Sequence, residues 1–148
     1  MDETLEMIIE NTGRKPVSCS CSECQQQCKT PCLGTPDDII NLIKAGYAKK
    51  LEMYQWDMGL ILGELPAPVT VYRPKKTESG CIFFKNGLCE LHEEGLKPTE
   101  GKLSHHTIKL DNFIFDMSLS WNVAREWMRL ENLPKIVRLL FYMEVFAK

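Results

Sequence analysis

The chain has 148 residues, of which 44% are hydrophobic, and a formal net charge of −2. This length allows one domain with a hydrophobic core that needs no disulfide bonds for stability, so we predict a single domain over residues 1–148. The slightly acidic balance argues against a protein that binds nucleic acid through bulk electrostatics.

The N-terminal segment MDETLEMIIENTGRKPVS is acidic, and its longest apolar run is Met7-Ile8-Ile9. A secretory signal needs a basic start and an apolar stretch of roughly 7–15 residues. No later stretch approaches the roughly 20 apolar residues of a membrane span. We therefore expect a cytoplasmic protein without a membrane partner, in which thiols stay reduced. The chain has seven cysteines, an odd number, so at least one lies outside any internal disulfide framework.

A short helix is predicted over residues 4–11, and it leads into a loop over residues 16–35. Besides cysteine, the only large apolar residues of this loop are Val17 and Leu33. Burial of side chains in the core therefore cannot give the loop its shape. Another interaction must organise it.

A second helix is predicted from GTPDDIINLIKAGYAKKL. Thr35 is a favourable N-cap, and Pro36 suits the first helical position. Gly46 weakens the pattern and marks either the end of the helix or a close contact. Four apolar residues recur every four positions and predict one buried stripe: Ile39, Ile43, Tyr47 and Leu51.

Strands and two further helices are predicted in the rest of the chain. Val69-Thr70-Val71-Tyr72 has the β-branched and aromatic residues of a strand, and CIFFKNGLCEL indicates a hairpin around Asn86-Gly87. A further strand is predicted in HTIKLDNFIFDM, residues 106–117. Two helices, divided at Asn132-Leu133-Pro134, form the C-terminal part, residues 117–148. Helical spacing relates Trp121, Ala124 and Met128 in the first helix, and Ile136, Leu140 and Met143 in the second.

These elements predict an α+β fold with several helices, in which a cysteine-rich metal-binding loop packs on a small antiparallel sheet or hairpin. Five cysteines fall within the fourteen residues CSCSECQQQCKTPC: Cys19, Cys21, Cys24, Cys28 and Cys32. Thiolates bind zinc and iron–sulfur clusters strongly, and spacings of one to three residues let successive thiolates face one point. Buried structural thiols are the alternative for one or two of the seven cysteines.

The hairpin supplies a second group of candidate ligands, Cys81, Cys89 and His92. If Asn86-Gly87 is a two-residue turn, Lys85 pairs with Leu88, Phe84 with Cys89, and Cys81 with His92. Residues that pair across two strands share a face, so Cys81 and His92 would then point together. A chelate between Cys89 and His92 would instead require the chain to leave the strand after Cys89. The sequence leaves both alternatives open.

The cysteine-rich loop, the helix start PCLGTPDDI and the segment CIFFKNGLCELHEEGLKPTEGK together resemble a zinc- or iron-chelating domain family named for a CxxCxxCC signature. Its members are described as metal-chelating or as Fe–S oxidoreductases, and the domain is similar to one in flagellin lysine methylases. The resemblance covers residues 19–106, the expected metal-chelating core. It implies ligation by five cysteines: Cys21, Cys24, Cys28, Cys81 and Cys89.

The chain departs from the family pattern at two points. The adjacent pair of cysteines is absent, because Cys28 and Cys32 are three residues apart, and the family's later cysteine falls at Gly101. Cys32, Cys19 or His92 is expected to replace the lost ligand.

Seven cysteines and His92 make eight candidate metal ligands. Eight would fill two tetrahedral zinc sites, or one four-thiolate [4Fe–4S] cluster with a second metal nearby. The expected cofactor is therefore zinc or iron. His105 and His106 are near enough in sequence to be further ligands, although exposed histidines are the commoner outcome.

Three functions fit this pattern. The first is a cytosolic metal-chelating domain that binds zinc or an iron–sulfur cluster. The second, which the resemblance allows, is an Fe–S redox or group-transfer enzyme. The third is an interaction module in which the metal supports a surface for a protein partner. The sequence predicts that the chain binds a metal ion, and it does not decide whether the chain is an enzyme.

Overall fold

The computed structural model describes residues 3–14, 16, 30–85, 88–103 and 114–147. Helices and small antiparallel sheets make up this part of the chain, so the predicted α+β class is confirmed. None of the described helices has the length and apolarity that a membrane span requires. The α-helices are α1 (Glu3–Thr12), α3 (Pro36–Lys44), α4 (Met58–Ile61), α5 (Leu91–Glu94), α6 (Thr99–Leu103), α7 (Leu119–Ala124) and α8 (Leu133–Phe146).

Helix α3 begins as the sequence predicts. Its N-cap Thr35 accepts a hydrogen bond at Oγ1 from the backbone N–H of Asp38, at 3.2 Å. The Asp38 carboxylate accepts in turn from the backbone N–H of Thr35, at 2.9 Å. This capping box satisfies two backbone donors at the helix start.

The predicted apolar stripe through Tyr47 and Leu51 is wrong, because α3 ends at Lys44. Gly46 has a φ of 95°, in the left-handed region that favours glycine, and it turns the chain out of the helix. A 3-10 turn, η1 (Ala48–Lys50), follows. Leu51 is buried, but as the first residue of a strand.

The longest sheet joins β1 (Leu51–Trp56) and β2 (Val69–Pro74) as an antiparallel pair. Strand β2 confirms the prediction for Val69-Thr70-Val71-Tyr72. Strand β1 was not predicted: its sequence LEMYQW buries only its two ends, and only its first residue, Leu51, falls in the predicted preceding helix. Two smaller antiparallel pairs follow as separate sheets, β3 (Lys76–Thr77) with β4 (Gly80–Cys81), and β5 (Phe84–Lys85) with β6 (Leu88–Cys89).

The hairpin register is confirmed where the strands pair: Phe84 lies opposite Cys89, and Lys85 opposite Leu88. The predicted pairing of Cys81 with His92 is wrong. Cys81 pairs with Lys76 in the preceding hairpin, and the chain leaves β6 after Cys89 to form α5. The backbone therefore follows the second alternative, the course that a Cys89–His92 chelate requires.

The C-terminal part contains two α-helices, as expected, with 3-10 turns at both ends of α7 and before α8. These turns are η2 (Phe115–Met117), η3 (Arg125–Trp127) and η4 (Leu130–Asn132). Residues 106–113 of the predicted strand lie outside the described residues. The end of that strand prediction is wrong, because residues 115–117 form η2.

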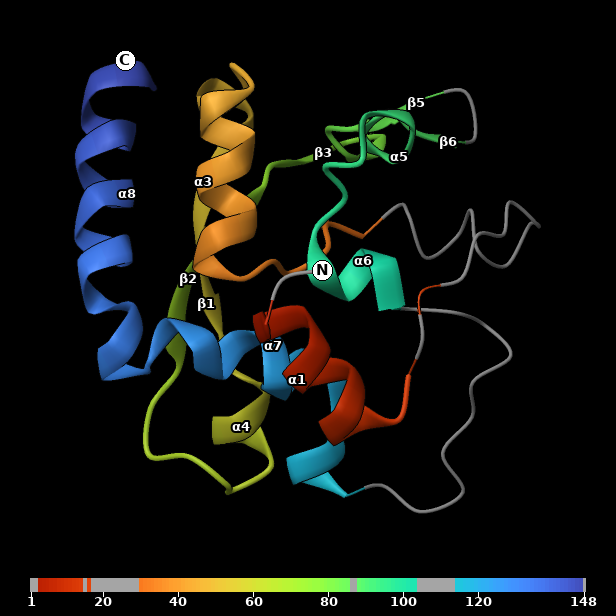
Figure 1. The fold of residues 1–148 in the computed structure, drawn as a ribbon, viewed down its shortest axis with the longest axis vertical. Coiled ribbons are helices and arrows are strands. Elements are labelled where there is room, and N and C mark those ends of the chain that lie inside the picture. Colours follow the sequence, from red (N-terminus) through yellow and green to blue (C-terminus); the bar gives the residue numbers. More distant parts are fainter. Residues whose placement is uncertain (1–2, 15, 17–29, 86–87, 104–113, 148) are drawn as a thin grey trace.

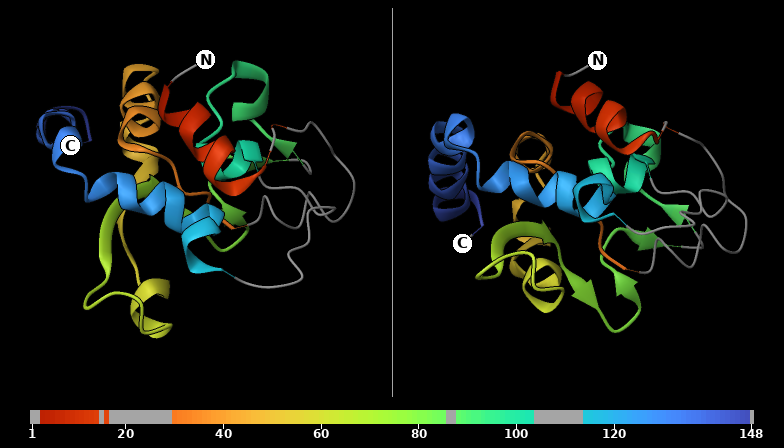
Figure 2. Two further views of the ribbon diagram at one scale, coloured as in Figure 1. Left: turned by 60° about the horizontal axis from the view of Figure 1, so that its bottom comes forward. Right: turned by 90° about the horizontal axis from the view of Figure 1, so that it is seen from below.

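Helices α3 and α8 stand side by side, with the β1–β2 sheet behind α3 (Figure 1). Helix α7 packs against both α1 and α6, while the two small hairpins and α5 lie on the side away from α8 (Figures 1 and 2). One hydrophobic core connects these parts. Its fully buried members include Ile8, Ile39, Leu42, Phe83, Leu91, Leu103, Val123 and Leu139.

The buried face of α8 differs from the expected one by a single position. Leu139 has no exposed surface, whereas Leu140, which has helical spacing with Ile136 and Met143, is 46% exposed. We expect Leu139→Ala to lower the free energy of unfolding by about 2–5 kcal/mol. The matched change Leu140→Ala is expected to alter it by less than about 0.5 kcal/mol. Urea unfolding of both variants tests this, and equal losses would contradict the packing.

Candidate metal centre

The C-terminal end of the cysteine-rich loop is fixed by backbone hydrogen bonds next to Cys32. The N–H of Leu33 donates to Oε1 of Glu100, and the N–H of Glu100 donates to the carbonyl of Leu33, both at 3.0 Å. The carbonyl of Gly34 accepts from Nε1 of Trp127 at 2.8 Å in a buried contact. These bonds hold Cys32 against α6 and the C-terminal helices.

A second set of hydrogen bonds fixes α6 to the start of α3. Oδ2 of Asp38, which caps α3, also accepts from the backbone N–H of Thr99 at 2.9 Å and from its hydroxyl at 2.5 Å. One carboxylate thus joins the first residues of two helices. As a result, α6 and the Cys32 segment form one rigid support.

Glu100 contributes to this support from a half-buried position. Burial raises the pKa of its carboxyl, while the hydrogen bond from Leu33 and the charge of Arg14 lower it. Arg14 also donates from Nη1 to the carbonyl of Leu103 at 3.4 Å. The segment KPTEGK does not predict this supporting role of Glu100. Charged residues are usually exposed, and Leu33, to which Glu100 is hydrogen-bonded, is distant in sequence.

The hairpins hold Cys81 and Cys89 near the core. Cys81 is buried in β4, and Cys89 is half-buried in β6. Phe83, which lies between them in sequence, has a fully buried side chain. The backbone carbonyl of Phe83 accepts a hydrogen bond from the N–H of Glu90 at 2.9 Å. Both cysteines thus lie in short hairpins that backbone hydrogen bonds hold together.

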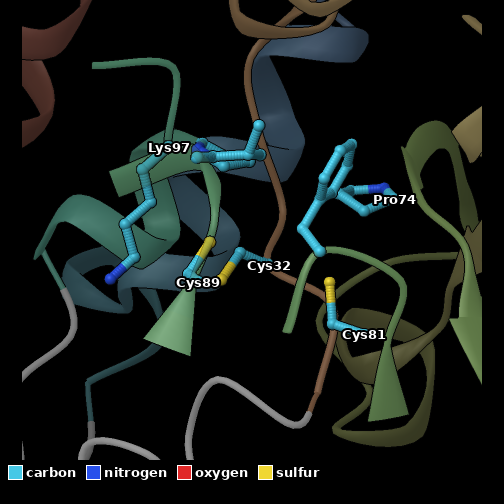
Figure 3. Close-up of a pocket in the computed structure, with 8 residues that line it drawn as sticks. Cys32, Pro74, Cys81, Cys89 and Lys97 are labelled. Atoms are coloured by element: carbon cyan, nitrogen blue, oxygen red, sulfur yellow. The ribbon is translucent and has the colours of Figure 1, made fainter. Parts of the chain in front are cut away.

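Cys32, Cys81 and Cys89 line a single pocket (Figure 3). Figure 3 shows the side chains of all three cysteines at this lining, with Cys81 and Cys89 on different strands. The cavity volume is about 10 Å³. This is near the minimum volume that holds one water molecule. The other lining residues are Pro74, Phe83, Leu91, Lys97 and Pro98.

The lining suits a soft metal. Apart from the three cysteines and Lys97, the described lining residues are apolar. Thiolate ligands select zinc, copper(I) and iron–sulfur clusters over hard cations such as magnesium.

Five of the eight predicted ligands cannot be assessed from the described side chains. Cys19, Cys21, Cys24 and Cys28 lie outside the described residues, as do His105 and His106. His92 is in α5, and its side chain is also outside the described part. Among the side chains that the structure describes, no group of three or more histidine, cysteine, aspartate or glutamate residues could hold a metal ion.

No protein-family model, curated protein or solved structure matches the chain. The family resemblance therefore rests on the sequence motifs alone. The geometry of the three described cysteines is a separate observation, which does not depend on that resemblance.

Proposed function

We propose that this chain is a metal-chelating domain in which cysteines of the loop and of the hairpin together hold zinc or an iron–sulfur cluster. The observation that supports this proposal is that Cys32, the last cysteine of the loop, lines the same pocket as Cys81 and Cys89. Cys32 is about fifty residues from Cys81 in sequence. A shared pocket is what a chelating site formed by two distant cysteine groups needs.

Chain length supports the participation of further loop cysteines. An extended chain spans at most about 3.6 Å per residue, so the Cα atom of Cys28 lies within about 14 Å of that of Cys32. Cys32 is held at the pocket by its neighbours' hydrogen bonds. One or more of the preceding cysteines can therefore reach the same metal and complete the four ligands that a structural zinc site needs.

The contact between Cys32 and Gly101 supports Cys32 as the replacement for the missing family ligand. The resemblance puts a cysteine at position 101, where this chain has glycine. A Cβ atom built on Gly101 would lie 2.8 Å from Sγ of Cys32. The thiol of Cys32 thus adjoins the position from which the family cysteine would extend.

Purified protein is expected to contain metal bound mainly by cysteine. The direct test is elemental analysis of protein purified anaerobically and without chelators, together with its visible absorption, because iron–sulfur proteins are brown and zinc proteins colourless. Less than about a tenth of an equivalent of zinc plus iron would contradict the proposal, since structural metal sites bind with apparent free energies of about 10–16 kcal/mol.

A further inference from the structure

Gly101 lies within α6, at the point where this helix meets Cys32. A Cβ atom at position 101 would lie 2.8 Å from Sγ of Cys32, and 3.0 and 3.1 Å from Cε and Cγ of Lys97. The contact with sulfur is closer than real Cβ atoms approach. Any residue larger than glycine would therefore force one of these neighbours to move.

The two neighbours differ in how easily they can move. Lys97 has a long side chain with several rotatable bonds, so its outer atoms can shift at little cost. Cys32 has one side-chain torsion, and its backbone is held through the paired hydrogen bonds between Leu33 and Glu100. Glu100 precedes Gly101, so moving α6 away would strain both bonds. Sγ would then leave its position by changing rotamer.

Backbone conformation does not require glycine at position 101. The glycines with positive φ in the described chain are Gly13, Gly46, Gly63, Gly80 and Gly95. Within a helix, glycine is less stable than alanine. Gly101 thus lowers the stability of α6 while leaving space for the sulfur of Cys32.

We propose that Gly101 is a positioning residue for the metal centre: the absence of a side chain at position 101 leaves the Cys32 sulfur in the pocket that Cys81 and Cys89 also line. This inference rests on the proposed metal-chelating function. The contact between Gly101 and Cys32 itself does not, so the two can be tested separately.

The test compares wild type with Gly101→Ala, Cys32→Ala and the double variant, using full-length protein and Lys102→Ala as a control on the same helix. Chelator competition is expected to show a 10- to 100-fold loss of zinc or iron affinity in Gly101→Ala, the range found when groups that orient ligands are changed. Lys102→Ala is expected to keep the wild-type affinity. Equal affinity in wild type and Gly101→Ala would overturn the inference.

Thermal unfolding of the same proteins tests the contact without reference to metal. In the Cys32→Ala background the clash with sulfur is gone, so Gly101→Ala is expected to raise Tm by about 2–4 °C through helix propensity. In wild type the same change is expected to lower Tm. If Gly101→Ala fails to fold, the double variant is expected to fold.

The outcomes separate the inference from the proposed function. Equal Tm shifts in both backgrounds, or failure of the double variant to fold as well, would overturn the inference while leaving metal binding intact. If the wild type holds no metal, but Gly101→Ala still shifts Tm in opposite directions in the wild-type and Cys32→Ala backgrounds, the proposed function and the metal role of Gly101 would both be wrong. Only the packing contact between Gly101 and Cys32 would then be supported.

Discussion

Cys89→Ser is expected to lower the metal content of the protein and to loosen residues 16–32 of the loop, which are distant in sequence. Cys89 lines the pocket with Cys32, and a serine hydroxyl is a much weaker ligand for zinc or iron than a thiolate. Loss of a direct ligand should exceed the 10- to 100-fold loss typical of changes to supporting groups. Elemental analysis and amide hydrogen exchange of the variant measure both effects.

The matched control for this variant is Lys85→Ser, which introduces the same residue in the paired strand of the hairpin. Lys85 is exposed, and its ion pair with Glu90 at 3.4 Å lies at the surface, where such pairs contribute little. It is expected to retain metal and loop protection. The proposal would be wrong if Cys89→Ser kept both as well, or if the control lost them equally.

Removal of the metal is expected to expose the amides of residues 16–32 to exchange while α7 and α8 stay protected. The loop has few apolar side chains, so under the proposed function its order would come from metal affinity, which becomes folding free energy when binding and ordering are coupled. Helix α8 is instead held by the core through Leu139. Comparing hydrogen exchange before and after chelation measures this difference.

Hydrogen bonds also determine where in the chain the increase in amide exchange should end. The N–H of Leu33 is bonded to Glu100, and the N–H of Thr35 to Asp38, so protection is expected to persist from residue 33 onwards. Equal protection of residues 16–32 in the metal-bound and metal-free forms would contradict the account. So would loss of α8 together with the loop.

Local interactions explain which parts of the fold could be predicted from the sequence. The start of α3 follows from Thr35, Pro36 and Asp38, which act within one helical turn. The pairing of Phe84 with Cys89 follows from a two-residue turn between them. In both cases, residues close in sequence determine the structure.

The errors arose where distant contacts decide the structure. Strand β1 forms because β2 pairs with it, although Leu51 and Trp56 are its only buried residues. Cys81 pairs with Lys76 because a second small hairpin precedes the predicted one. Leu139 rather than Leu140 is buried because α8 packs on α3, an orientation that periodicity alone does not define.

The candidate site shows the same division. Cysteine spacing identified Cys32, Cys81 and Cys89 as candidates, and the structure brings these three to one pocket. The supporting roles of Glu100 and Gly101 could not be predicted, because they depend on how α6 meets the end of the loop. A glycine in a polar segment is ordinarily taken for a turn residue.

A structure of the anaerobically purified, metal-bound protein tests the central claim most directly. The account predicts at least one metal with ligands from both groups: two or more of Cys19, Cys21, Cys24, Cys28 and Cys32, together with Cys81, Cys89 or His92. Zinc–sulfur bonds in such a site are about 2.3 Å long. The claim would be contradicted if the Cys81 and Cys89 sulfurs and both His92 ring nitrogens lay more than about 8 Å from every loop sulfur, a gap too wide for a shared metal or cluster.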